Sequence, residues 1–383
     1  MKMSITQSAA LSSAAAEGLP YAFWRSPGEV GFSALISTSA PDTAAVFDGD
    51  GVPGFVAAPF DSDDGNRAWR FAADVLIGEE GIRFRNGTAL DEHPVTEMQA
   101  RISAGRLRRP LQAPAARGDA PQPTARAAYE DRVRRAVKQI DAGRCDKIVL
   151  SRIEPRPLPG DYDLITLAER LAEVHPHALV CVFSSEPTGT WLVATPEILM
   201  TVDRDEIHTM ALAGTQWPPG GTALSDVRWS EKIVLEQGLV ADFIRAAFAA
   251  EGVDSLDETP PATVQAANLC HLRSEFRAPT VPPAALAGLL RRLHPTSAVC
   301  GMPRAEARAF ILAEEGDTRG FYTGYFGPAN LDGRTALYVN LRSARVAGHE
   351  VYLHVGGGIV GASDPALEWE ETVAKTRTIA CVL

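Results

Sequence analysis

The chain reads GFYTGYFGPAN at residues 320–330, TALYVNLRSARVAG at 335–348 and HEVYLHVGGGIVG at 349–361. Each segment is rich in aromatic and β-branched residues and ends in turn residues, which is typical of a β-strand. No helical pattern separates the segments, so these strands are expected to pair antiparallel and not through parallel crossovers. Helical patterns alternate with other strands upstream. The sequence therefore predicts an α+β fold with a large antiparallel component, and not a doubly wound parallel sheet.

The remainder of the chain divides into three parts. Residues 20–105 alternate short β-like runs with Gly, Pro and Asp turns, which indicates an N-terminal antiparallel sheet region. Residues 106–126 are rich in Pro, Ala and Arg and are expected to form a loop. Residues 127–380 carry the mixed helices and strands of the core, and residues 1–18 are expected to be a frayed start. We expect one domain over residues 1–383, with the loop bridging its two parts.

The composition argues against several classes of protein. A net charge of −11 disfavours nucleic acid or an anionic membrane surface as the main partner, although a site can still carry local cations for a small anionic substrate. No stretch approaches the roughly 20 apolar residues of a membrane helix, and the N-terminus lacks an apolar segment long enough for export. The 5 cysteines are scattered without metal-binding spacing, which predicts reduced thiols in a cytoplasmic protein.

The glycine run GGGIVG at 356–361 formally matches the pattern GxGxxG. A dinucleotide site would need a helix that opens within the motif and an acidic residue roughly 20 positions further on. Here a Ser-Asp-Pro turn separates the glycines from the next helix, and the chain ends soon afterwards at Leu383. We instead expect backbone held close to a group that a Cβ atom would exclude, with a simple tight turn as the alternative.

Three carboxylates lie close together on the final predicted helix, which Asp364 is expected to cap. Glu368, Glu371 and Lys375 share one face of this helix, whereas Glu370 is expected to point into solvent. On an exposed face the carboxylates and the lysine would form an ion-pair stripe. On a buried face they would need a cation, and hard oxygen ligands of this kind suit Mg²⁺.

Three further ionisable residues occupy positions that permit chemistry. Lys147 opens the strand KIVLS, and Glu197 lies between two apolar runs. A lysine at a strand start is most often solvated, but a buried one can act as a base. A carboxyl group in an apolar wall has a raised pKa and can act as a general acid, although a lone structural acid is the commoner case. Glu236 lies in a predicted, largely buried helix and fits either a paired structural acid or a third metal ligand.

Arginine and histidine residues complete the set of candidates. Arg342 and Arg345 are expected to face opposite sides of a strand, and one of them is placed to clamp a substrate carboxylate. His271 and His294 lack the spacing of paired metal ligands. Each fits a structural hydrogen-bonding role.

Together and in this order, these segments resemble the chorismate-utilising enzymes, which include isochorismate synthases, salicylate synthases, anthranilate synthase and aminodeoxychorismate synthase. The resemblance covers residues 125–380 and is specific as a set, whereas the first 105 residues match only in general character. It implies an α+β fold of large antiparallel sheets packed as a sandwich and flanked by helices. The matching segments are KIVLSR (147–152), TPE (195–197), ALAGT (211–215), the predicted helix with Glu236, HL (271–272), LHPTSAVCGMP (293–303), RGFYTGYFG (319–327), LRSA (341–344) and VGGGIVGASDPALEWEETVAK (355–375).

Within this family, the details resemble the isochorismate synthases most closely. That resemblance implies a Mg²⁺-dependent, reversible isomerisation in which water attacks C2 of chorismate while the C4 hydroxyl leaves. Lys147 would be the base and Glu197 the acid. The implied Mg²⁺ ligands are Glu236, Glu368 and Glu371, and the implied contacts of chorismate are Gly214, Thr215, His271, Arg342, Gly357 and Lys375.

Several positions distinguish the relatives from one another. Ammonia-using members generally lack a lysine at the position of Lys147, and aminodeoxychorismate synthases carry a lysine where Ala213 stands, so both positions favour water as the nucleophile. Salicylate synthase, which forms isochorismate and then eliminates pyruvate, is the main alternative. Many relatives have Glu-His where this chain has Glu236 and Gln237, and an acid where it has Ile233, which implies weaker Mg²⁺ binding. A monomer without a glutaminase subunit is expected, and the pathway, whether menaquinone, siderophore or salicylate, stays open.

Overall fold

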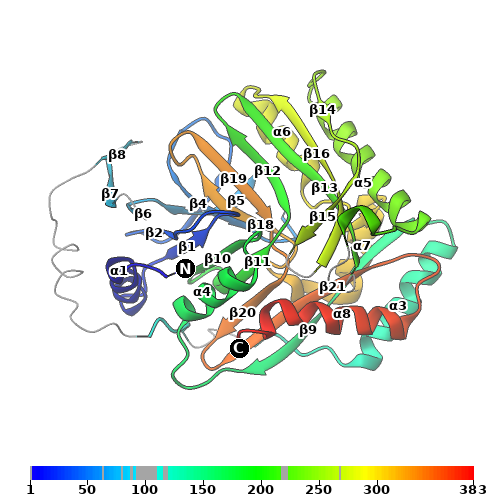
Figure 1. The fold of residues 1–383 in the computed structure, drawn as a ribbon, viewed down its shortest axis with the longest axis horizontal. Helices are drawn as coiled ribbons and strands as arrows, with labels where there is room; N and C mark the ends of the chain where they lie inside the picture. The colour runs from blue at the N-terminus through cyan, green and yellow to red at the C-terminus, as the bar shows by residue number, and fades with distance from the viewer. Residues whose placement is uncertain are drawn as a thin grey trace.

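The computed structural model describes residues 2–62, 64–78, 81–86, 89–91, 110–114, 120–216, 223–266 and 269–383. Its strands form two large antiparallel sheets (Figure 1). The 11-stranded sheet runs in the order β17-β9-β21-β20-β11-β10-β1-β2-β6-β7-β8, and the 10-stranded sheet contains β14-β16-β13-β12-β19-β18-β4-β5-β3, with β15 paired to β16. The predicted α+β class with large antiparallel sheets is confirmed.

The strands of the first sheet are β1 (Tyr21–Arg25), β2 (Ser33–Ile36), β6 (Val75–Gly78), β7 (Gly81–Asn86), β8 (Ala89–Asp91), β9 (Lys147–Pro157), β10 (Leu179–Ser185), β11 (Gly189–Thr195), β17 (Gly301–Met302), β20 (Ser343–Ala347) and β21 (Glu350–Ile359). Those of the second sheet are β3 (Asp42–Ala45), β4 (Gly54–Ala58), β5 (Arg67–Ala72), β12 (Ile198–Asp203), β13 (Glu206–Gln216), β14 (Asp257–Glu258), β15 (Ala262–Ala266), β16 (Leu269–Pro279), β18 (Tyr325–Ala329) and β19 (Arg334–Val339). Strands from residues 21–91 extend both sheets.

Aromatic side chains fill the space between the two sheets. Phe183 and Trp191 of the first sheet stack with ring centroids 6.5 Å apart, and Phe183 also stacks on Phe326 of the second sheet at 5.5 Å. Helices cover the outer faces, as the resemblance implied: α1 and α4 pack on the first sheet, and α5 and α6 on the second. The described helices are α1 (Ile5–Ala16), α3 (Arg126–Asp141), α4 (Leu164–Val174), α5 (Glu231–Ala250), α6 (Pro283–Leu293), α7 (Arg304–Glu315) and α8 (Pro365–Ala380), with 3₁₀ turns η1 (Leu224–Asp226) and η2 (Gly316–Arg319).

Two of the points where the chain crosses from one sheet to the other are neighbours in space. Glu197 lies in the link between β11 of the first sheet and β12 of the second, and Arg342 lies in the link between β19 and β20. The segment 335–348 is therefore two strands of different sheets, and the single strand predicted there is wrong. Arg342 has a left-handed φ of 49°, which breaks the strand. The links are hydrogen-bonded side by side, since Ala194 N donates to Arg342 O at 3.0 Å and Val339 N to Glu197 O at 3.0 Å.

The N-terminal segment is ordered, so the predicted frayed start is wrong. Ser4 and Gln7 form a reciprocal capping box at the start of α1, which satisfies backbone N–H groups that would otherwise lack partners. Leu11 is fully buried and joins the core on the outer face of the first sheet. Of the predicted loop 106–126, residues 106–109 and 115–119 lie outside the described part, and Leu111 within it is buried.

Candidate active site

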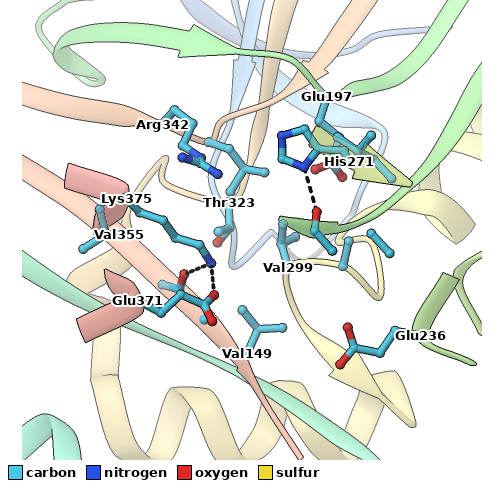
Figure 2. A pocket seen from close by; sticks show the side chains of 18 of the residues that line it. Val149, Glu197, Glu236, His271, Val299, Thr323, Arg342, Val355, Glu371 and Lys375 are labelled. Atoms are coloured by element: carbon cyan, nitrogen blue, oxygen red, sulfur yellow. Dashed lines mark hydrogen bonds and ion pairs between the residues drawn. The ribbon is translucent and has the colours of Figure 1, made fainter. Parts of the chain in front are cut away.

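The candidate residues meet in one cavity of about 380 Å³ (Figure 2). The cavity lies where the two chain crossings and the ends of β9, β13 and β21 face α5 and α8. Thr215 follows Gly214 in β13, but its side chain lies outside the described part of the chain. The candidates that line the cavity are Lys147, Glu197, Gly214, Glu236, His271, Arg342, Gly357, Glu368, Glu371 and Lys375.

Glu197 is a buried acid with cationic neighbours. Its side chain is 7% exposed, and burial raises the pKa of this carboxyl to about 7, against the lowering influence of Lys147 and Arg342. Near neutral pH the group is therefore present in both protonated and ionised forms. A carboxyl poised in this way can donate a proton to a leaving group.

The glycine run of β21 brings Lys147 close to the backbone. Gly356, Gly357 and Gly358 are paired with β9 inside the sheet, so both the dinucleotide loop and the tight turn are excluded. A Cβ atom on Gly358 would lie 2.8 Å from Lys147 Cε, and one on Gly356 would lie 3.2 Å from Tyr322 Oη. These contacts confirm the expected close approach. The group that a Cβ atom on Gly358 would displace is the side chain of Lys147.

The face of α8 that carries the carboxylates is turned toward the protein. Glu368 is 8% exposed and accepts a hydrogen bond from Ser363 Oγ at 2.6 Å. Lys375 Nζ forms an ion pair with Glu371 at 2.7 Å and donates to Gly356 O at 2.8 Å. The exposed ion-pair stripe is therefore wrong for Glu368, and Lys375 ties the helix to the glycine strand.

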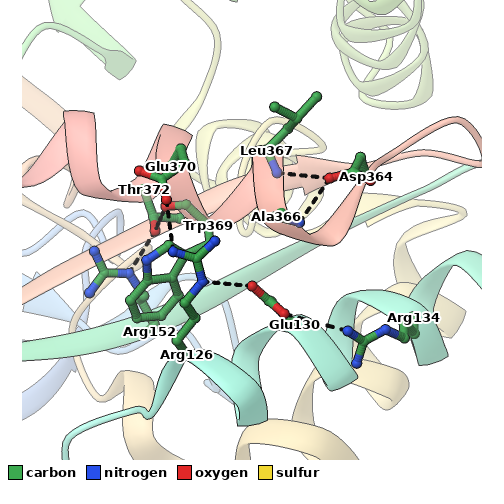
Figure 3. Close-up of polar contacts among 10 residues, drawn as sticks. All are labelled: Arg126, Glu130, Arg134, Arg152, Asp364, Ala366, Leu367, Trp369, Glu370 and Thr372. Carbon is green, nitrogen blue, oxygen red and sulfur yellow. Dashed lines mark hydrogen bonds and ion pairs between the residues drawn. The ribbon is translucent and has the colours of Figure 1, made fainter.

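Contacts of α8 outside the cavity explain how the helix is held (Figure 3). Asp364 caps it as predicted, accepting from Ala366 N at 2.9 Å and Leu367 N at 3.0 Å. Glu370 points away from the cavity and pairs with Arg126 of α3 at 2.9 Å. The buried Arg152 donates to Thr372 Oγ1 at 2.6 Å and lies over the Trp369 ring at 4.2 Å, with Arg126 also facing that ring. These contacts are structural.

His271 is held as a neutral hydrogen-bonding group. Its Nδ1 lies 2.7 Å from Gly214 O, and because a carbonyl oxygen can only accept, Nδ1 carries the proton. Burial, together with the positive charges of Arg342 and Lys375, lowers the pKa of His271 to about 4. His294 lies away from the cavity, where its Nε2 is 3.1 Å from Pro59 O, which fits the structural role expected for it.

Glu236 faces the cavity from α5, on a different side from Glu371 and Lys375 (Figure 2). The first half of α5 is less buried than predicted, because Val234 and Leu235 are 50% and 69% exposed. Gln237 is buried and donates to Ala211 O at 3.1 Å, which holds the helix against β13.

The three candidate carboxylates have the donor chemistry of a Mg²⁺ site, since hard carboxylate oxygens from two helices face one cavity. Glu368 and Glu371 both lie beside Gly357. Glu371 also pairs with Lys375, and Glu236 lies on another side of the cavity. Among the described residues, no three His, Cys, Asp or Glu side chains come close enough to hold a metal ion.

The cavity wall contains residues to which the sequence assigned no role. Tyr322 and Thr323 come from the link between η2 and β18, and His354 comes from β21. One signal was available for His354, because it alternates with Gly356 and Gly358 and must share their face of the strand.

Comparison with known proteins places this arrangement in a family. The sequence profile of the family described as "Chorismate binding enzyme" matches residues 89–383. The chain belongs to the chorismate-binding enzyme family. All 5 of its cysteines are free, and no helix in the described ranges is long and apolar enough to span a membrane.

Individual relatives of this family member agree with the assignment. A salicylate biosynthesis isochorismate synthase of Pseudomonas aeruginosa is 35% identical over 68% of this chain and 55% of its own length. An anthranilate synthase component 1 of Aeropyrum pernix is 29% identical over 70% of this chain and 64% of its own length. The chain thus spans less than two thirds of these curated relatives. The solved menaquinone-specific isochorismate synthase of Escherichia coli matches 99% of this chain and 91% of its own with a TM-score of 0.78 at 20% identity, which shows the same fold.

Proposed function

We propose that this protein is an isochorismate synthase, which isomerises chorismate to isochorismate by water attack at C2 and loss of the C4 hydroxyl. One observation carries the proposal most: Glu197, a buried carboxyl with a pKa of about 7, faces the same cavity as Lys147. The reaction needs a base and an acid in one site, and these two residues supply them. The isochorismate synthases among the relatives support the same assignment.

The two residues divide the proton transfers between them. Lys147, in its neutral form, takes a proton from the attacking water, and protonated Glu197 gives a proton to the C4 hydroxyl, which leaves as water. The forward reaction ends with a charged lysine and an ionised carboxylate. In the reverse reaction the two residues exchange roles, so the same pair supports isomerisation in both directions.

The remaining polar residues bind the substrate. Chorismate is a dicarboxylate, and Arg342 and Lys375 bring positive charge to the cavity wall of a protein that is acidic overall. His271 stays neutral and can contribute a hydrogen bond without adding charge. Gly214, Thr215 and Gly357 are the remaining proposed contacts of the substrate.

We also propose Mg²⁺ as the cofactor, held by Glu236, Glu368 and Glu371. Bound there, the ion would neutralise a carboxylate of chorismate. We further propose that the enzyme works as a monomer and without a glutaminase subunit, because water and not ammonia is the nucleophile.

Product analysis tests the proposed function. The purified protein is incubated with chorismate and Mg²⁺, with and without ammonium, and the products are identified by chromatography and mass spectrometry. A mixture of chorismate and isochorismate without pyruvate is expected. Salicylate with equimolar pyruvate would instead identify a salicylate synthase, and a product that forms only with ammonium would overturn water as the nucleophile.

A further inference from the structure

One buried polar side chain in the cavity wall has no role in the chemistry described above. His354 of β21 lines the cavity and is 2% exposed. Neither of its ring nitrogens has a hydrogen-bond partner within the described ranges. The same is true of the buried Oγ of Ser343, which lies directly opposite His354 on β20. Since buried polar atoms in native proteins are nearly always hydrogen-bonded, this pair calls for a partner that the described residues do not supply.

His354 lies on the face of β21 that also faces Lys147. Residues two apart on a strand share a face, so His354, Gly356 and Gly358 form one row. Lys147 lies against Gly358, and the hydroxyl of Tyr322 lies against Gly356. The two glycines leave this row without side chains, and His354 ends it four residues, or about 13 Å, from Gly358. A small ligand against the glycines would therefore lie between Lys147 and His354.

The imidazole of His354 is rigid and uncharged. Its ring centroid lies 5.0 Å from that of Trp191 and 5.4 Å from that of Tyr322, so aromatic packing fixes its orientation. Burial, together with the positive charges of Arg345 and Arg319, lowers the pKa of His354 to about 3. A neutral imidazole offers one N–H donor and one acceptor nitrogen. Such a group can donate to a ligand oxygen and accept from a hydroxyl or a water at the same time.

We propose that His354 is a further substrate-binding residue, whose imidazole hydrogen-bonds a carboxylate or hydroxyl oxygen of chorismate at the inner end of the cavity, directly or through one water shared with Ser343. The identity of the ligand rests on the proposed function. The position of the contact is inferred only from the residues that form the cavity wall.

The test compares two substitutions at this position with a control elsewhere. His354→Leu removes both polar atoms, whereas His354→Gln keeps a donor and an acceptor. Tyr21→Phe is the control, because it also deletes a buried polar atom, but away from the cavity. Loss of one hydrogen bond to a charged ligand group should lower kcat/KM for chorismate about tenfold or more in His354→Leu, chiefly through KM. His354→Gln should recover most of this loss, and Tyr21→Phe should match the wild type.

A spectroscopic measurement on the unmodified cavity complements the kinetics. In protein labelled with ¹⁵N-histidine, chorismate should shift a ring nitrogen of His354, assigned by its absence in His354→Gln. This result decides the question if His354→Leu does not fold. An active wild type whose His354 signal does not move, or a folded His354→Leu with wild-type KM, would overturn this proposal and leave the proposed function standing. A wild type that neither binds nor converts chorismate would overturn both.

Discussion

Replacing Glu197 with Gln should abolish turnover and at the same time stabilise the protein at alkaline pH. The amide keeps the shape of the side chain but cannot donate the proton that the leaving hydroxyl needs. Burial raises the pKa of the carboxyl from 4.5 to about 7 in the folded protein. An acid whose pKa is higher in the folded state binds protons more tightly there, so folding is favoured at low pH and penalised once the group is ionised. The penalty grows between pH 4.5 and 7 and is complete above pH 7.

The size of this penalty follows from the two pKa values. A change from 4.5 to about 7 corresponds to about 3 kcal/mol. The free energy of unfolding of Glu197→Gln should therefore exceed that of the wild type by up to about 3 kcal/mol at pH 8, and the two should converge near pH 4.5. For the wild type, the same titration predicts that kcat/KM falls as pH rises above about 7, because the acid loses its proton.

Urea denaturation at pH 5 and pH 8, together with initial rates, measures both effects. Glu370→Gln is the matched control, since it makes the same chemical change on the outer face of α8, where the carboxylate pairs with Arg126. This control should keep wild-type turnover and show no stabilisation that grows with pH. Retained turnover in Glu197→Gln would refute the role of the acid. An equal or lower stability at pH 8 would refute the raised pKa.

Three further predictions test the neighbouring parts of the site. Lys147→Ala should lower kcat at least about 100-fold with the fold intact by circular dichroism, because a positioned base contributes that much; near-normal turnover would remove Lys147 as the base. Gly358→Ala should lower kcat with little change in melting temperature, because the new Cβ displaces the flexible end of Lys147. The control is Gly78→Ala, at a strand glycine with open space around it, which should change neither kcat nor melting temperature. Equal kcat for both variants would contradict the close approach of Lys147 to Gly358. Chelation by EDTA should stop turnover and added Mg²⁺ should restore it, and an unaffected rate would refute the metal site.

The sequence predicted those features that depend on local pattern and spacing. The antiparallel strands, the cap at Asp364 and the outward direction of Glu370 follow from alternation, capping chemistry and helical periodicity. The spacing of Glu368 and Lys375 correctly predicted that both lie on the same face of a helix. Spacing could not show that this face is buried, because that depends on the sheet against which the helix packs.

Other features depend on tertiary contacts and were missed for that reason. The chain passes between the sheets at Arg342 because this residue has a left-handed backbone conformation. Such a conformation cannot be predicted from the sequence at a non-glycine residue. The ordering of residues 2–18 depends on the burial of Leu11 against the first sheet. The orientation of the Glu236 helix could not be read from residue types.

The most direct test of the central claim follows the oxygen atom of the attacking water. The protein is incubated with unlabelled chorismate in H₂¹⁸O, and isochorismate is isolated at early conversion and examined by mass spectrometry with fragmentation. Water attack at C2 predicts one ¹⁸O atom in each isochorismate molecule, located in the C2 hydroxyl. Isochorismate that forms without the label would contradict addition of water, and with it the assignment of Lys147 and Glu197 as base and acid.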